Sequence, residues 1–195
     1  MKVSREQAAE NRERVVEVAS KLFRERGFDG IGVADLMKAA GLTHGGFYGH
    51  FASKEDLAAE AYGRALDASL QTWSAEIEKA PDKALSKIVS GYLSEAHLDA
   101  PESGCLIAAL GSDLRRQAPP IRRVVTEGIQ AFVGQFMRIL PGKSKSARRR
   151  KALAHFAAMV GAVTVARAVD DPRLSKDILA AVALLLSDPG RESGF

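Results

Sequence analysis

Apolar residues near the N-terminus recur with the period of an α-helix and predict a compact group of three helices. Between residues 7 and 26 they return every three or four positions, with charged residues on the other faces. Gly27 ends this helix, and a second is expected over residues 33–40. Gly41 then separates the second helix from a third. Two helices joined by a glycine turn at this spacing have the size of a helix-turn-helix unit.

The third helix is expected to begin at Thr43, which is a good N-cap, and to run to about His50. Phe47 and Phe51 stand one helical turn apart, so we expect both side chains in the core. A helix that enters the major groove needs small or polar residues at its leading end, because bulk keeps side chains from base edges. Small or polar residues occupy that end: Thr43, His44, Gly45 and Gly46.

A long helix follows, and it leaves the N-terminal group. Ser53 with Asp56 three positions later resembles a capping box, and the apolar spacing continues to about Lys79. Because no stretch shows the alternation of a strand, we expect an all-α fold. Its parts would be a DNA-binding domain over residues 1–53 and a helical ligand-binding and dimerisation domain over 54–195. Further helices are expected over residues 82–98, 105–116, 119–140, 145–169 and 173–187.

Composition narrows the class of protein. The chain is 46% hydrophobic and 27% charged, and it has no apolar run of the ~20 residues that a membrane span needs. Charges recur through the first residues, where a secretory signal would be apolar. The single cysteine, Cys105, forms no internal disulfide and builds no cysteine zinc site. We therefore expect a cytoplasmic protein that does not contact membranes and has no metal, no cofactor and no catalytic residues.

Charge is compatible with nucleic acid but is unevenly placed. The net charge is +4, yet residues 1–55 hold nine Lys and Arg against eight Asp and Glu, so a positive face there must come from arrangement. Residues 115–151 hold eleven Lys and Arg against one acid, Glu127. This later segment is either a second nucleic-acid surface or a solvated stretch that faces water or an acidic neighbour.

One stretch of the sequence resembles a known family. The string GLTHGGFYGHF over residues 41–51, the SKEDL that follows and the LFRERGFDG that ends the first helix are similar to the signature of the TetR/AcrR family of regulators. The resemblance covers roughly residues 10–65. It implies that Thr43, His44, Gly45 and Gly46 face the bases of a DNA operator. Phosphates would be held by three further residues, Tyr48, His50 and Lys54.

The resemblance also implies a mode of action. A homodimeric repressor would bind a palindromic double-stranded operator and be released by a small-molecule inducer, whose identity the sequence does not reveal. The helices at 145–169 and 173–187 carry continuous apolar faces that need cover on more than one side, which favours a dimer interface through both.

Candidate inducer contacts are large apolar residues of the later helices, which can line a pocket or simply fill the core. They are Trp73, Tyr92, Phe132 and Phe136, together with Cys105. Cys105 at a helix start could be a reactive thiolate or inert packing. Two other classes remain as alternatives, namely a Cys-His enzyme using His97 and an architectural protein that binds DNA without sequence preference.

Overall fold

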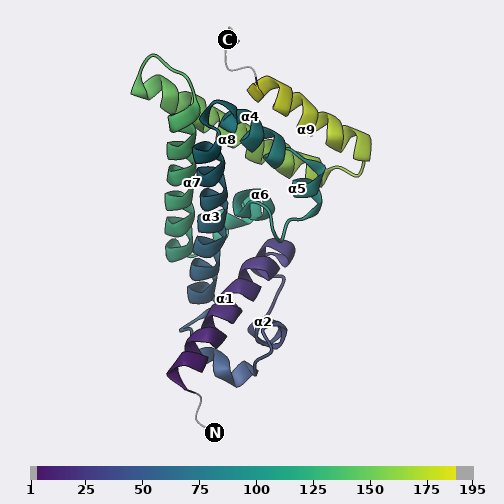
Figure 1. Ribbon diagram of the computed structural model, residues 1–195. Helices are drawn as coiled ribbons and strands as arrows, with labels where there is room; N and C mark the ends of the chain where they lie inside the picture. The colour runs from purple at the N-terminus through teal and green to yellow at the C-terminus, as the bar shows by residue number, and fades with distance from the viewer. Residues whose placement is uncertain (1–3, 188–195) are drawn as a thin grey trace. The chain divides into compact units, whose positions relative to one another are not determined.

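The computed structural model describes residues 4–187, and every regular element among them is helical. The expected all-α fold is confirmed (Figure 1). In chain order the elements are α1 (Arg5–Arg26), α2 (Val33–Ala39), the 3₁₀ helix η1 (His44–Gly49), α3 (Lys54–Lys79), α4 (Pro81–Tyr92), α5 (Glu95–Asp99), α6 (Leu106–Leu110), the 3₁₀ helix η2 (Gly111–Arg116), α7 (Pro119–Ile139), α8 (Lys145–Ala168) and α9 (Pro172–Ser187).

The chain forms two compact units. Unit 1 comprises residues 1–67 and 101–127, and unit 2 comprises residues 68–100 and 128–195. The long helices α3 and α7 each contribute to both units. The expected boundary between a DNA-binding domain and the rest of the chain after residue 53 stays a prediction.

Three expected helices differ from those observed, each for a local reason. The helix expected over 82–98 is interrupted because the Ser94 hydroxyl accepts a hydrogen bond from the His97 N–H at 3.2 Å and starts α5 anew. The helix expected over 105–116 changes to a 3₁₀ helix at Gly111. The third helix is 3₁₀ rather than α, and three of its six residues are glycine, which disfavours a regular α-helix.

Unit 1 has a core of apolar side chains from α1, α2 and η1. α1 buries Val15, Ala19 and Phe23, against which α2 and α6 pack. Phe47 and Phe51 are 1% and 2% exposed, which confirms their expected place in the core. Their burial lets the intervening residues of η1 face outward.

Unit 2 has aromatic side chains in its core, and hydrogen bonds from polar side chains link its helices. The Gln135 amide of α7 donates to the Leu70 carbonyl oxygen at 3.1 Å and to the Ser74 hydroxyl at 2.6 Å, which joins α7 to α3. The Arg167 guanidinium of α8 donates to two carbonyl oxygens of α5. α8 packs along α9, and α4 also packs against α9.

Candidate nucleic-acid interface

A glycine turn sets the path of the chain from α2 into η1. The Gly41 N–H donates to the Lys38 carbonyl oxygen at 3.0 Å, and the Leu42 N–H donates to the Met37 carbonyl oxygen at 2.9 Å. Together they form a Schellman motif, which requires a left-handed residue after the cap. Gly41 has φ +72°, so a residue without Cβ suits this position.

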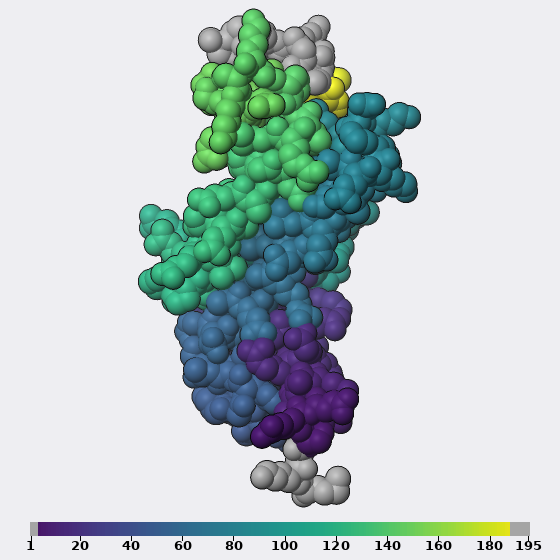
Figure 2. Space-filling view, turned by 60° about the vertical axis from the view of Figure 1, so that its left-hand side comes forward, coloured from purple at the N-terminus to yellow at the C-terminus, as the bar shows by residue number. Residues whose placement is uncertain are grey.

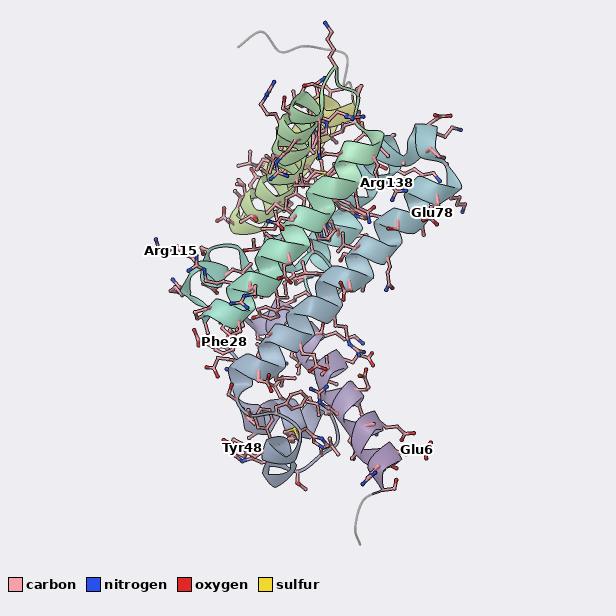
Figure 3. All side chains as sticks on the ribbon, turned by 90° about the vertical axis from the view of Figure 1, so that its left-hand side faces the viewer. Glu6, Phe28, Tyr48, Glu78, Arg115 and Arg138 are labelled. Carbon is pink, nitrogen blue, oxygen red and sulfur yellow. The ribbon has the colours of Figure 1, made fainter. Side chains whose placement is uncertain are left out.

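η1 presents polar side chains outward from a buried base. Thr43, His44 and Tyr48 are exposed, and His50 is half-buried. Tyr48 is 72% exposed, the ring stands edge-on to Phe47 at 5.3 Å between centroids, and the side chain points away from the protein (Figure 3). Thr43 occupies the expected N-cap position, but its hydroxyl makes no capping hydrogen bond.

The glycines of η1 leave space in front of the helix. A Cβ built on Gly45 or on Gly49 would meet nothing within 4 Å, and neither glycine has positive φ. A Cβ on Gly46 would make ordinary contacts with Met37 at 3.7 Å and Thr43 at 3.8 Å. The fold therefore does not need glycine at Gly45 or Gly49, and a surface this bare allows another molecule to approach the backbone closely.

The start of α3 is capped almost as the sequence predicts. The Ser53 hydroxyl accepts a hydrogen bond from the Asp56 N–H at 3.1 Å, while the Asp56 carboxylate accepts one from the Ala52 N–H at 3.2 Å. Lys54, in the first turn, donates from its ammonium to the Phe28 carbonyl oxygen at 2.5 Å and lies 4.3 Å from the Phe28 ring centroid. A phosphate contact by this ammonium would compete with an internal partner.

An arginine that the resemblance did not single out joins three elements of unit 1. The Arg12 guanidinium donates to both carboxylate oxygens of Glu60, at 2.5 and 2.6 Å, and lies 4.8 Å from the centre of the Phe51 ring. The hydrogen bond to Glu60 raises the pKa of Arg12. Arg12 thus links α1 to α3 and to Phe51 in the segment between η1 and α3, through a partner 48 positions away.

A second arginine ties α1 to the segment before α6. Arg24 donates to the Ser20 carbonyl oxygen at 3.0 Å and to the Gly104 carbonyl oxygen at 2.9 Å. Burial lowers the pKa of this guanidinium. The contact joins residues far apart in sequence, so helical spacing offered no signal for it.

Four of the five candidate inducer contacts meet in unit 2. The Trp73 ring lies 4.8 Å from Phe132, 5.0 Å from Phe136 and 6.2 Å from Tyr92, measured between centroids. All four side chains are buried. We call these four residues the aromatic cluster. Cys105 is also buried, but it belongs to unit 1.

Three neighbours of the aromatic cluster were not predicted from the sequence. Phe156 stacks on Phe132 at 5.3 Å, His155 lies 5.9 Å from Phe136, and His97 lies 4.5 Å from Tyr92. Burial lowers the pKa of His97 and of His155, although each ring nitrogen Nδ1 faces a backbone carbonyl oxygen. Phe156 lies on α8, a helix whose apolar faces were expected to form the dimer interface, and apolar residues on two sides of it could have suggested both roles.

Two kinds of feature were not found within residues 4–187. No group of three or more His, Cys, Asp or Glu side chains is placed to hold a metal ion. No helix of this part of the chain is long and apolar enough to cross a membrane.

Comparison with known proteins points to one family. Residues 15–61 match the profile described as "Bacterial regulatory proteins, tetR family". The HTH-type transcriptional repressor DhaR of Mycobacterium sp. (strain GP1) is 26% identical over 140 residues, which are 71% of this chain and 70% of DhaR. The HTH-type transcriptional regulator AcrR of Shigella flexneri is 36% identical over 59 residues, 30% of this chain and 27% of AcrR.

A solved structure extends the likeness over nearly the whole chain. The crystal structure of a TetR transcriptional regulator from Chloroflexus aurantiacus J-10-FL superposes with a TM-score of 0.76 at 25% identity, and the match covers 93% of this chain and 96% of that one. The N-terminal match contains α2, η1 and the turn between them, and the structural match adds the C-terminal helices. Residues 15–61 therefore match the TetR family of bacterial regulators, and nearly the whole chain shares the fold of a TetR transcriptional regulator.

Proposed function

We propose that this regulator is a homodimeric repressor that binds a palindromic operator through η1 and is released by a small-molecule inducer. The observation that carries the proposal is the outward face of η1, where Thr43, His44 and Tyr48 are exposed above the buried Phe47 and Phe51. Hydroxyl and imidazole groups on a short helix can reach base edges and phosphate oxygens.

The bare backbone of η1 supports the same proposal. Glycine within a helical segment is destabilising by roughly 0.5–1 kcal/mol relative to alanine, and the surroundings of Gly45 leave room for a Cβ. A duplex that approaches the backbone supplies a reason for glycine which the folded chain does not. In this arrangement Thr43 and His44 contact bases, Tyr48, His50 and Lys54 contact phosphates, and Gly45 and Gly46 permit close approach.

An exposed uncharged strip on α8 and α9 supports dimerisation through these helices. Leu153 and Val165 of α8 are 42% and 52% exposed, and Leu184 and Leu185 of α9 are 78% and 63% exposed. Between Ala152 and Ala166 the sequence of α8 has no Asp, Glu, Lys or Arg. Such a surface is suited to pairing with its own copy in a four-helix interface.

The aromatic cluster supports an apolar, aromatic inducer in unit 2. Its rings are already packed against one another, so an inducer must displace side chains to enter, and binding would favour a second conformation of the dimer. Because a dimer grips two half-sites about one helical turn or a multiple apart, a conformation with another spacing releases the operator. The name of the matched relative DhaR, a transcriptional repressor, agrees with repression rather than activation.

Selection of bound duplexes from a random library by the purified full-length protein tests the proposal. Enrichment of a palindrome is expected, with a preference over unrelated duplexes of roughly a thousandfold or more. Equal binding to unrelated duplexes would instead favour an architectural protein. The selected operator then allows the inducer to be sought, since Trp73 is the only tryptophan of the chain and its fluorescence reports on the aromatic cluster.

A further inference from the structure

The N-terminal end of α8 concentrates positive charge. We call it the cationic end and define it as Lys143, Lys145, Arg148, Arg149, Arg150 and Lys151. The first five of these residues are exposed, and Lys151 is half-buried. The light-green segment that contains them lies on the outer surface of the molecule (Figure 2).

No acidic side chain neutralises this end from nearby in the sequence. Between Glu127 and Asp170 the chain has no Asp or Glu. Across the described residues, none of the five exposed cations takes part in an ion pair, whereas Lys21, Arg64, Lys87 and Lys176 do. The charge of the cationic end is therefore directed to the outside.

The position of the cationic end at a helix N-terminus adds to the electrostatic repulsion among its charges. A helix N-terminus carries partial positive charge and favours acidic residues, and α1, α2, α4 and α5 each have an acid in the first turn. α8 has none there and begins with Lys145 instead. These like charges repel one another and also the positive end of the helix dipole. The repulsion destabilises the folded chain unless an anion outside the chain compensates for it.

The cations are held on an ordered scaffold rather than on a loose tail. The Ser144 hydroxyl accepts a hydrogen bond from the Ala147 N–H at 3.1 Å and so caps α8. Directly after the cationic end and over the next two turns, Ala152, Phe156 and Met159 are buried in the core of unit 2. Arg148, Arg149 and Arg150 thus project from a fixed helical start, around which long side chains can reach several anionic groups.

We propose that the cationic end binds the phosphate backbone of duplex DNA outside the operator contacts of η1, without sequence preference. A phosphate backbone offers closely spaced anionic groups to a surface that has charge but no shaped pocket. An anionic membrane fits less well, because helices that bind membranes present exposed Trp, Phe or Leu beside the charge. Residues 141–151 contain no large apolar side chain except Pro141. This contact goes beyond the proposed operator recognition.

The test uses the full-length chain in which His44→Ala and Tyr48→Ala remove two exposed side chains of η1 that are proposed to contact DNA. In this background, Arg148→Gln, Arg149→Gln and Arg150→Gln remove three exposed charges while keeping residues that favour a helix. The matched control replaces Arg115, Arg122 and Arg123, three exposed arginines of unit 1, by glutamine. The probe is a fluorescent duplex of random sequence, titrated between about 50 and 200 mM salt.

We expect the α8 triple variant to bind the random duplex about tenfold more weakly at about 0.1 M salt, and the slope of log affinity against log salt to become shallower by about 2 to 3. The unit 1 control should change both much less. Equal losses in the two variants, or no loss in either, would overturn the proposal.

Two further measurements separate duplex binding by the cationic end from membrane binding and from operator recognition. Vesicles rich in anionic lipid that bind the parent chain and not the α8 variant, without any effect on duplex binding, would assign the cationic end to a membrane and overturn the proposal. Operator selection by the chain with an intact η1 and the α8 substitutions should return the same sequence. Failure of that selection in the unaltered protein would reject the proposed function without affecting the duplex titration.

Discussion

η1 and the aromatic cluster are both candidate binding regions, but they are built in opposite ways. The polar side chains of η1 stand in solvent on a base of two buried phenylalanines. The aromatic cluster is closed, and its four side chains make up much of the core of unit 2. Binding residues on η1 can thus change without loss of the fold, whereas binding in the cluster is coupled to the packing that holds the unit together.

The histidines repeat this contrast. His44 is exposed on η1 and His50, directly after it, is half-buried, while His97 and His155 are enclosed in unit 2. A residue type that reaches solvent in one region is part of the packing in the other. The comparison predicts that substitutions in η1 change DNA binding more than stability and that substitutions in the cluster do the reverse.

The largest expected effect comes from truncating one aromatic side chain in each region. Phe132→Ala should lower the free energy of unfolding by about 3–5 kcal/mol, because it leaves a cavity in a closed core. Tyr48→Ala should change it by less than about 0.5 kcal/mol, because the ring is largely exposed. Urea denaturation followed by circular dichroism, at one protein concentration, measures both. Similar losses for the two variants would contradict the comparison.

Within η1, base contacts and phosphate contacts should separate. His44→Ala should change the preferred base at one operator position by about 1–3 kcal/mol, since a base edge loses its partner. Tyr48→Phe and Lys54→Ala should weaken binding to all duplexes alike, by about 1 kcal/mol each. Affinities for the selected operator and single-base variants of it measure these effects. Lys54→Ala also loses the bond to Phe28, so its affinity is compared at equal folded fraction, and a reversal of the two patterns would reject the assignment.

Gly41 and Gly45, which lie before and within η1, form a matched pair for alanine substitution. Gly41→Ala should lower the free energy of unfolding by about 1–2 kcal/mol, because φ at this residue is +72°. Gly45→Ala should leave it unchanged or raise it by up to about 1 kcal/mol, because a Cβ meets nothing there. Gly45→Ala should nevertheless weaken operator binding. Full operator affinity in that variant would show that DNA does not approach the backbone at Gly45.

The smallest expected effect is the dependence of the melting temperature on pH. Burial holds the pKa of His97 and His155 below the ordinary value of 6.5, so the unfolded chain binds more protons than the folded chain as pH falls through this range. The melting temperature should therefore fall between about pH 7.5 and pH 5.5, the loss beginning near the unfolded pKa. The double variant His97→Gln, His155→Gln should show a shallower dependence than the parent chain. An unchanged slope would exclude these histidines as its source.

Much of the helical fold, including the buried side of η1 and the cap of α3, could be predicted from short stretches of sequence. Phe47 and Phe51, one turn apart, were expected in the core and are buried. Ser53 and Asp56 form the expected cap within one residue of the predicted pattern. Each of these features depends on residues within a few positions of one another, and helix periodicity and capping are local properties of the backbone.

Long-range partners could not be predicted in this way. Lys54 was expected to contact a phosphate, but its ammonium donates to the Phe28 carbonyl oxygen, and Arg12 is held by Glu60, 48 positions away. Stacking of Phe156 on Phe132 depends on how α8 and α7 pack, and spacing along either helix does not specify the side chain opposite. The splitting of two expected helices near Ser94 and Gly111 also arose from local conformations that an apolar pattern does not distinguish.

Residue types at short, regular separations predicted the helical class and the short helix with its glycines, and one stretch of sequence carried the resemblance to the TetR/AcrR family. Three other outcomes emerged only from the folded chain: which cations are engaged internally, which aromatic rings meet in the cluster, and that the five exposed cations at the start of α8 have no ion-pair partner among residues 4–187. Those outcomes depend on close packing between distant segments, where a contact forms only when several side chains fit together.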